Sequence, residues 1–225
     1  MNRRVVAIDG PAGSGKSTVA RGVADALRLL VLDTGAMYRA ATLAALDAGA
    51  DLADADAVTA AARQADIAVS EDGSGTVQLD GRDVTDEIRG PAVTAAVSLV
   101  SAHPGVREVM VARQRAWVDR HDGGVVEGRD IGTVVFPDAT VKVFLTASDE
   151  ERARRRHRDE AAAARRPDVD EVREALVRRD ALDSGRAMSP LRPADDALVI
   201  DTTGRTVDDV VREIVARYAS AIGVG

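Results

Sequence analysis

Residues 10–17 read Gly-Pro-Ala-Gly-Ser-Gly-Lys-Ser, which matches the pattern G-x-x-x-x-G-K-[ST] at every constrained position. In such a loop the glycines let successive backbone N–H groups turn inward around phosphate oxygens, and the following helix directs its positive dipole end at the same anion. Lys16 would bridge the β- and γ-phosphates of ATP, and the Ser17 hydroxyl would ligate Mg²⁺. The predicted ATP-binding residues are Gly10, Pro11, Ala12, Gly13, Ser14, Gly15, Lys16, Ser17 and Thr18.

The residues on either side of this loop supply the context that the motif requires. Residues 5–8 form a short, mostly β-branched run, which is typical of a buried strand. After the loop, Val19, Val23 and Leu27 recur at four-residue spacing, which predicts a helix with one packing face. The order strand, loop, helix favours a phosphate-binding loop over a glycine-rich turn with an exposed lysine.

Further short apolar runs alternate with helical stretches along the chain. They are residues 30–32, 125–126, 141–145 and 198–200. This alternation predicts an α/β fold with a mostly parallel sheet that helices cover on both faces. At 225 residues, one domain with insertions is expected. The last helix should begin at Thr206, and its buried side should consist of Val207, Val210, Val211, Ile214 and Tyr218.

Residues 67–84 break the alternation. Three short strands, at 67–69, 76–79 and 82–84, are joined by Asp72-Gly73 and Asp80-Gly81, which are dipeptides typical of tight turns. The sequence therefore predicts antiparallel hairpins in an inserted subdomain.

Residues 150–166 are very polar and contain few apolar anchors. This pattern predicts a helical surface element of low local stability. Its arginines are Arg152, Arg154, Arg155, Arg156, Arg158, Arg165 and Arg166.

The composition excludes several classes of protein. Because the chain has no cysteine, disulfides, thiolate zinc sites and thiol catalysis are excluded. The net charge of −7 argues against a general nucleic-acid binder. No segment is apolar and long enough to be a signal peptide or to span a bilayer. We expect a cytoplasmic protein with neither a nucleic acid nor a membrane as partner.

Several kinds of phosphate-loop protein have to be distinguished. A GTPase switch usually carries Asn-Lys-x-Asp, and this tetrapeptide is absent from the sequence. A motor or transporter subunit would need a longer chain or a segment that couples it to a partner. A phosphotransferase for a small acceptor fits best, while a kinase of another small phosphate or hydroxyl acceptor and a nucleotide-binding regulator without an acceptor stay open.

Three segments look like the diagnostic segments of bacterial cytidylate kinases, and the resemblance covers about Val5 to Asp201. They are residues 33–39 (Asp-Thr-Gly-Ala-Met-Tyr-Arg), 127–137 (Glu-Gly-Arg-Asp-Ile-Gly-Thr-Val-Val-Phe-Pro) and 179–186 (Arg-Asp-Ala-Leu-Asp-Ser-Gly-Arg). The first two separate this family from adenylate, thymidylate and shikimate kinases. Thr34 stands where the family often has serine, which keeps the hydroxyl.

The resemblance implies the fold and the reaction. The fold would be that of P-loop nucleoside-monophosphate kinases, with a five-stranded parallel sheet, helices on both faces, a small antiparallel β insert and an arginine-rich lid. Residues 1–225 would form a single kinase domain, with a monophosphate-binding insert at 61–100 and the lid at 150–167. The enzyme would be a monomer that uses Mg²⁺ and transfers the γ-phosphate of ATP to CMP or dCMP.

The resemblance also assigns residues that would bind CMP. Cytosine presents an N4 amino donor beside the N3 and O2 acceptors, so Asp130 would accept from N4 while Arg107 and Ser98 address N3 and O2. The acceptor phosphate would be gripped by guanidinium groups, which can hold two oxygens at once. The remaining assignments are Arg39, Arg129 and Arg186 for the phosphate, Tyr38 for the pocket wall, Arg179 with Asp183 for the sugar hydroxyls, and Thr34 as a further CMP-binding residue.

The catalytic residues implied in this way are all cationic. They are Lys16, Arg129 and the lid arginines Arg152, Arg156 and Arg158, whose spacings could place them on one helical face. A phosphate monoester is already largely ionised near neutral pH, so no general base is expected.

Overall fold

A computed structural model describes residues 4–71, 74–162, 168–186 and 188–223, with only the backbone described for 159–162. Its main sheet has five parallel strands in the order β2-β6-β1-β7-β8. The strands are β1 (Arg4–Asp9), β2 (Val31–Asp33), β6 (Gly123–Gly128), β7 (Val141–Thr146) and β8 (Leu198–Asp201). The predicted α/β fold with a five-stranded parallel sheet is confirmed.

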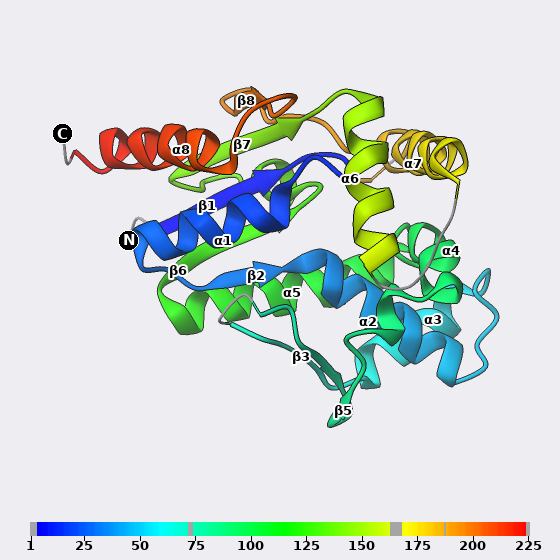
Figure 1. Cartoon of the computed structure of the whole chain (residues 1–225). Coiled ribbons are helices and arrows are strands. Elements are labelled where there is room, and N and C mark those ends of the chain that lie inside the picture. Colours follow the sequence, from blue (N-terminus) through cyan, green and yellow to red (C-terminus); the bar gives the residue numbers. More distant parts are fainter. Residues whose placement is uncertain (1–3, 72–73, 163–167, 187, 224–225) are drawn as a thin grey trace.

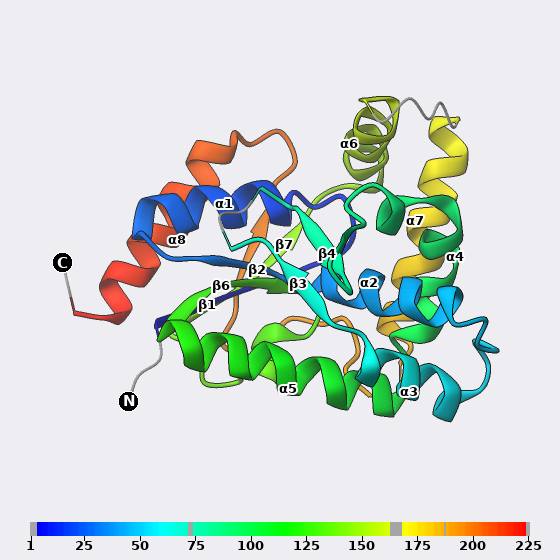
Figure 2. The ribbon, with the colours of Figure 1, turned by 90° about the horizontal axis from the view of Figure 1, so that it is seen from below.

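Helices cover both faces of this sheet (Figures 1 and 2). On one face lie α1 (Lys16–Leu27) and α8 (Val207–Ala221), and on the other lie α2 (Thr34–Asp47), α3 (Ala55–Gln64) and α5 (Pro104–His121). Successive side chains of a strand point to opposite faces, so Val6 and Ile8 of β1 pack toward α1 and α8, while Val5 and Ala7 pack toward α2 and α5. None of the described helices is long and apolar enough to cross a membrane.

The last helix begins where the sequence predicts, and of the residues predicted to form its buried side only Val207 is exposed. The Thr206 hydroxyl accepts a hydrogen bond from the Asp209 backbone N–H at 3.2 Å, which caps α8. Val210, Ile214 and Tyr218 are buried, and Val211 is partly buried against the same cluster. Val207 was expected on the buried side and is 41% exposed, because it stands in the first turn, before the helix meets the sheet.

A separate small sheet lies against α2, and its strands are antiparallel as predicted. It consists of β3 (Ile67–Val69), β4 (Val77–Leu79) and β5 (Arg82–Asp83). Asp80 and Gly81 both adopt positive φ, 52° and 78°, which a two-residue hairpin turn requires. Asp72 and Gly73, the other predicted turn, lie outside the described residues.

The remaining helices gather at the carboxyl ends of the parallel strands, where ligands bind in open α/β sheets (Figure 1). They are α4 (Pro91–Val100), α6 (Asp149–Ala162), α7 (Val169–Ser184), a 3₁₀ turn at Glu87–Arg89 and a π-helical turn at Ile131–Val135. The predicted polar element at 150–166 is helical through residue 162. Arg165 and Arg166 lie outside the described residues.

Candidate active site

The phosphate-binding loop connects β1 to α1 and needs its glycines for two different reasons. A Cβ atom on Gly10 would lie 2.2 Å from the carbonyl oxygen of Leu145, so no side chain fits there. Gly15 has a φ of 91° directly before the first residue of α1, in the left-handed region that favours glycine. The loop that the motif predicts is therefore formed by residues 10–15.

A cavity of about 1060 Å³ opens at this loop. The loop side of the cavity is lined by Ala12, Gly13, Gly15, Lys16, Ser17 and Thr18. Of the described residues, seven arginines also line the cavity, and four of them were predicted to bind the substrates, namely Arg39, Arg129, Arg156 and Arg179. Of the predicted ATP-binding residues, Gly10, Pro11 and Ser14 shape the loop without lining the cavity.

Lys16 and Glu127 are opposite charges buried beside each other at the base of the cavity. The Lys16 ammonium donates to the carbonyl oxygen of Pro11 at 2.8 Å, and the Ser17 hydroxyl donates to the Glu127 carboxylate at 3.0 Å. Burial and the charge of Arg129 lower the pKa of Lys16 to about 7. Burial and the charge of Asp33 raise the pKa of Glu127 to about 7.

The sequence pattern assigns no role to Glu127, although it lies within one of the segments quoted above. It is buried at the carboxyl end of β6, beside the strand that leads into the phosphate loop. A charged residue at the end of an otherwise apolar strand is a signal that could have identified it.

Oxygen ligands suited to Mg²⁺ meet at this place. Ser17, Glu127 and Asp33 all line the cavity beside the loop. Mg²⁺ in nucleotide enzymes is usually held by one or two carboxylates together with substrate phosphates. The side chains present therefore fit the predicted ion.

The arginines of the cavity repel one another. Burial, followed by the charges of Arg179 and Arg156, lowers the pKa of Arg39 to about 9. Burial and the charge of Arg129 lower the pKa of Arg179 to about 10. Such crowding of positive charge is relieved when an anion binds among the guanidinium groups.

Two of these arginines are held in place by neighbouring segments. Arg39 donates to the Ile88 carbonyl at 2.9 Å and to the Thr94 hydroxyl at 3.0 Å. Arg129 donates to the carbonyl of Gly10 at 2.9 Å, which connects it directly to the phosphate loop.

Asp183 lies within ion-pair distance of three of the predicted acceptor-site arginines. This buried carboxylate accepts from Arg129 Nε at 3.1 Å and pairs with Arg186, and Arg179 Nε lies 3.9 Å away. Arg129 follows β6, and Asp183 lies near the end of α7, 54 positions later in the chain. The structure therefore brings together most of the residues predicted to bind the acceptor phosphate and sugar.

Two of the three residues predicted to read the base, Asp130 and Arg107, form a buried ion pair with each other. Asp130 and Arg107 are each 4% exposed, and the Arg107 guanidinium lies 5.5 Å from the centroid of the Tyr38 ring. Neither Asp130, Arg107 nor Tyr38 lines the cavity. Asp130 thus has Arg107 as its partner in this structure, and a base that it recognises must enter beside this pair.

Ser98 was predicted to contact the base, and the serine hydroxyl that bonds to Arg186 in this structure is that of Ser101, to which the sequence pattern assigns no role. Ser101 Oγ accepts from Arg186 at 2.9 Å and donates to the Ser98 carbonyl at 3.3 Å. Ser98 is half-buried on α4. Thr34 uses its hydroxyl to donate to the Glu127 carbonyl at 2.7 Å, so that hydroxyl holds α2 against β6.

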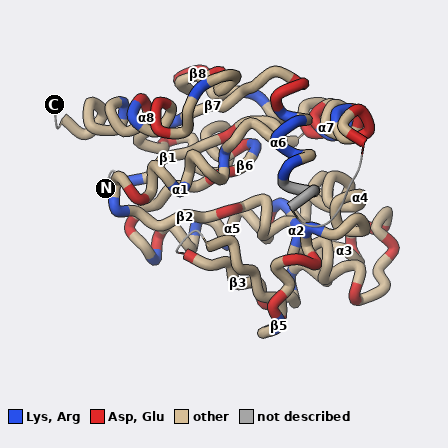
Figure 3. Tube along the Cα trace, in the orientation of Figure 1, with Lys and Arg blue, Asp and Glu red and all other residues tan. Residues whose placement is uncertain are grey.

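The three predicted lid arginines have different surroundings, although basic residues follow one another along α6 (Figure 3). Arg152 is buried, donates to the Ala12 carbonyl at 3.1 Å, and pairs with Asp180 of α7. Arg156 lines the cavity. Arg158 is exposed and does not line it, because two residues along a helix turn by about 200°. The expectation that all three share one face is wrong for Arg158.

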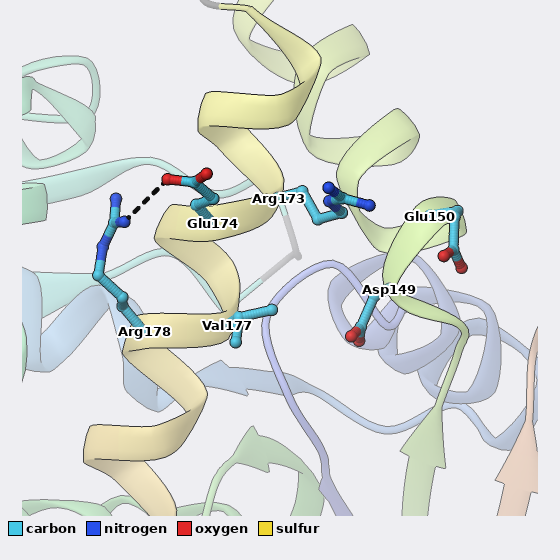
Figure 4. A pocket seen from close by; sticks show the side chains of 6 residues that line it. All are labelled: Asp149, Glu150, Arg173, Glu174, Val177 and Arg178. Atoms are coloured by element: carbon cyan, nitrogen blue, oxygen red, sulfur yellow. Dashed lines mark hydrogen bonds and ion pairs between the residues drawn. The ribbon is translucent and has the colours of Figure 1, made fainter.

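A second hollow, of about 370 Å³, lies between α6 and α7 (Figure 4). Carboxylates and guanidinium groups alternate along it, and Arg178 donates to Glu174 at 3.2 Å. No residue of the phosphate loop lines it. It shares Glu174 and Arg178 with the larger cavity, and its mixed charges make it a poor site for a polyanion. The residues that line it are Asp149, Glu150, Arg173, Glu174, Val177 and Arg178.

Known proteins are similar to this chain in sequence and in fold. The model of the cytidylate kinase family matches residues 6–220. A cytidylate kinase of Corynebacterium efficiens is 55% identical over 94% of this chain and 92% of its own length. One from Geobacillus kaustophilus is 52% identical over 99% of this chain and all of its own. Among solved structures, an uncharacterized protein from Eubacterium ventriosum aligns with a TM-score of 0.56 at 12% identity, covering 97% of this chain and 99% of its own, which supports the fold alone.

Proposed function

The chain belongs to the cytidylate kinase family, and on this premise we propose that it transfers the γ-phosphate of ATP to CMP or dCMP, giving ADP and CDP or dCDP. One observation carries the proposal for this chain. A single cavity has the phosphate loop on one side and Arg39, Arg129, Arg156 and Arg179 on the others. It can therefore hold two phosphate groups, one from each substrate, facing each other.

In the proposed reaction an oxygen of the acceptor phosphate attacks the γ-phosphorus of ATP in line, and the bond to the β-phosphate oxygen breaks. The protein contributes position and positive charge. Lys16 binds the donor phosphates, and Arg39 and Arg129 hold the acceptor phosphate. No side chain is needed to remove a proton, because the acceptor is already ionised at neutral pH.

Mg²⁺ would be held by Ser17 and by the Glu127 carboxylate beside it. When bound, the ion neutralises charge on the donor phosphates. The raised pKa of Glu127, about 7, which follows from burial, means that this carboxylate ionises most readily when a cation is close.

Base selection is assigned to the buried pair of Asp130 and Arg107. Asp130 offers acceptor oxygens for the cytosine amino group, and Arg107 offers donors for N3 and O2. Uracil has an oxygen in place of that amino group, so the carboxylate would face an acceptor.

We assign acceptor binding to an insert at residues 61–100 and closure over both substrates to the lid at 150–167, of which residues 163–167 lie outside the described part. Arg156 is the lid arginine placed to reach a phosphate, since it lines the cavity. Closure would exclude water, which competes as an acceptor. The monomeric state and the cytoplasmic location stay predictions, for size-exclusion chromatography and cell fractionation to test.

A coupled assay of ADP release tests the proposal. CMP, dCMP, UMP, AMP and shikimate are offered to the wild type with Mg²⁺ and ATP, and Lys16→Ala is the control for contaminating kinases. CMP and dCMP should be the best acceptors. Another preferred acceptor would replace the substrate assignment, and ATP hydrolysis that no acceptor stimulates would favour a nucleotide-binding regulator.

A further inference from the structure

Asp9 is a buried carboxylate to which neither the phosphate-loop motif nor the proposed reaction assigns a task. It is the last residue of β1, directly before the loop, and it is 4% exposed. One carboxylate oxygen accepts from the backbone N–H of Ile131 at 2.8 Å, and the other accepts from that of Gly132 at 2.7 Å. These two residues directly follow Asp130, so the carboxylate holds the backbone next to the base-reading residue.

The next residue, Gly10, holds the other side of the same segment. Its carbonyl oxygen accepts from the guanidinium of Arg129 at 2.9 Å, and Arg129 also donates to Asp183. Two consecutive residues, the last of β1 and the first of the phosphate loop, thus bind the segment 129–132 in two ways. Gly10 holds the side chain of Arg129, which lines the cavity, and Asp9 holds the backbone beyond Asp130.

Stability does not explain why a carboxylate stands here. Burial raises the pKa of Asp9 to about 6 although two N–H groups donate to it, and the nearby charge of Asp130 raises it further. A buried charge opposes folding unless its partners compensate fully. What the carboxylate gains is a separate acceptor oxygen for each of two consecutive backbone N–H groups.

We propose that Asp9 is a positioning residue for acceptor recognition, which fixes the segment 129–132 against the base of the phosphate loop so that Arg129 and Asp130 keep the geometry that selects CMP. This inference rests on the proposed function. Asp9 itself touches no substrate. It acts through the backbone N–H groups of Ile131 and Gly132.

Asp9→Asn tests this role, because asparagine keeps one acceptor oxygen and turns an NH₂ group toward the second backbone N–H. A matched control is Asp54→Asn. The Asp54 carboxylate accepts from the backbone N–H groups of Asp56 and Ala57 at 3.0 and 3.1 Å, and it is exposed at the start of α3, outside the cavity lining. Both variants change a carboxylate that binds two backbone donors into an amide, but in Asp54 a single oxygen accepts both bonds and in Asp9 each oxygen accepts one.

For each protein, kcat and KM are measured with CMP, UMP and ATP, beside thermal unfolding. In Asp9→Asn the KM for CMP should rise roughly tenfold or more, and the CMP preference over UMP should narrow, because one buried donor loses its partner. The KM for ATP should stay within about twofold of the wild-type value. Asp54→Asn should match the wild type in all kinetic constants.

The outcomes separate this inference from the proposed function. If the wild type does not use CMP, the proposed function fails. If the wild type uses CMP and folded Asp9→Asn has the same CMP constants and the same preference, Asp9 serves the fold alone and the inference is overturned. An equal rise in the KM for ATP also overturns it, because Asp9 would then act on the phosphate loop itself. Should Asp9→Asn not fold, Asp9→Ser, whose hydroxyl oxygen accepts one bond without opposing a donor, is judged by the same criteria.

Discussion

Replacing Asp130 by asparagine changes base selection and stability in a single variant. The wild-type carboxylate pairs with Arg107, both residues are 4% exposed, and the Tyr38 ring lies beside the guanidinium. In asparagine an amide oxygen can still accept from Arg107, while the amide NH₂ can donate to O4 of uracil. The variant therefore weakens a contact to cytosine and creates one to uracil.

Two magnitudes follow from this geometry. Removing one partner of a buried pair costs roughly 3–5 kcal/mol, and we expect about 1–3 kcal/mol for asparagine because one hydrogen bond to Arg107 survives. For a chain of this length that corresponds to a fall in Tm of roughly 2–12 °C. A site built to hydrogen-bond a substrate group can reject an analogue that lacks it by as much as roughly 10⁴-fold, so UMP should be a much poorer acceptor than CMP for the wild type.

The assay measures kcat/KM for CMP and UMP by coupled ADP release, with thermal unfolding in parallel. In Asp130→Asn the value for CMP should fall more than the value for UMP, so that their ratio narrows. Asp138→Asn, the same change at an exposed site eight residues later, should leave the ratio of the two kcat/KM values and the Tm unchanged. Asp130 is not the base-reading residue if the wild type uses both acceptors equally, or if the ratio is the same in Asp130→Asn.

Other changes test other parts of the site. Lys16→Met should abolish phosphoryl transfer, because it removes the cation that binds the donor phosphates; comparable turnover in this variant would refute the assignment of the donor site. Arg39→Ala should raise the KM for CMP roughly tenfold or more and leave the KM for ATP unchanged, since it removes a charge-assisted contact to the acceptor phosphate. Loss of ATP affinity alone would refute the assignment of Arg39 to the acceptor site. Arg156→Ala should lower kcat at least about tenfold and Arg158→Ala should not, because only Arg156 lines the cavity; equal losses would argue against this distinction. The raised pKa of Asp9, about 6, means that the folded state binds its proton more readily than the unfolded chain, so the free energy of unfolding should decrease from about pH 4 to about pH 6 by up to about 3 kcal/mol, and urea titrations should find a smaller slope in Asp9→Asn.

The parts of the fold that follow from local rules could be predicted from the sequence. The loop at residues 10–17, the strands beside it and the hairpin at Asp80-Gly81 depend on backbone conformation and periodicity within a few residues. The buried side of α8 was correct at Val210 and wrong at Val207, because periodicity does not say where along its length a helix meets the sheet.

The network of the site could not be predicted in the same way. Which residues pair depends on strand order, and no local pattern indicates that the Asp9 carboxylate reaches backbone groups more than 120 positions later. The segment that carries Glu127 was identified by resemblance, yet its contact with Ser17 follows only from the sheet register. Ser101 was missed for a similar reason, since its bond to Arg186 depends on how the end of α4 packs near α7.

The register of the two central strands explains why donor and acceptor groups meet. Ile8 is level with Glu127, and Asp9 is level with Gly128, so the phosphate loop leaves β1 where the acceptor segment leaves β6. A slip by one residue would turn Glu127 to the opposite face of the sheet, away from Ser17, and would move Arg129 away from the Gly10 carbonyl. Apolar side chains on both faces of β1 fix this register, because Val6 and Ile8 pack on one side and Val5 and Ala7 on the other. The buried core of the sheet, and not the loops alone, thus sets the separation between the two phosphate sites.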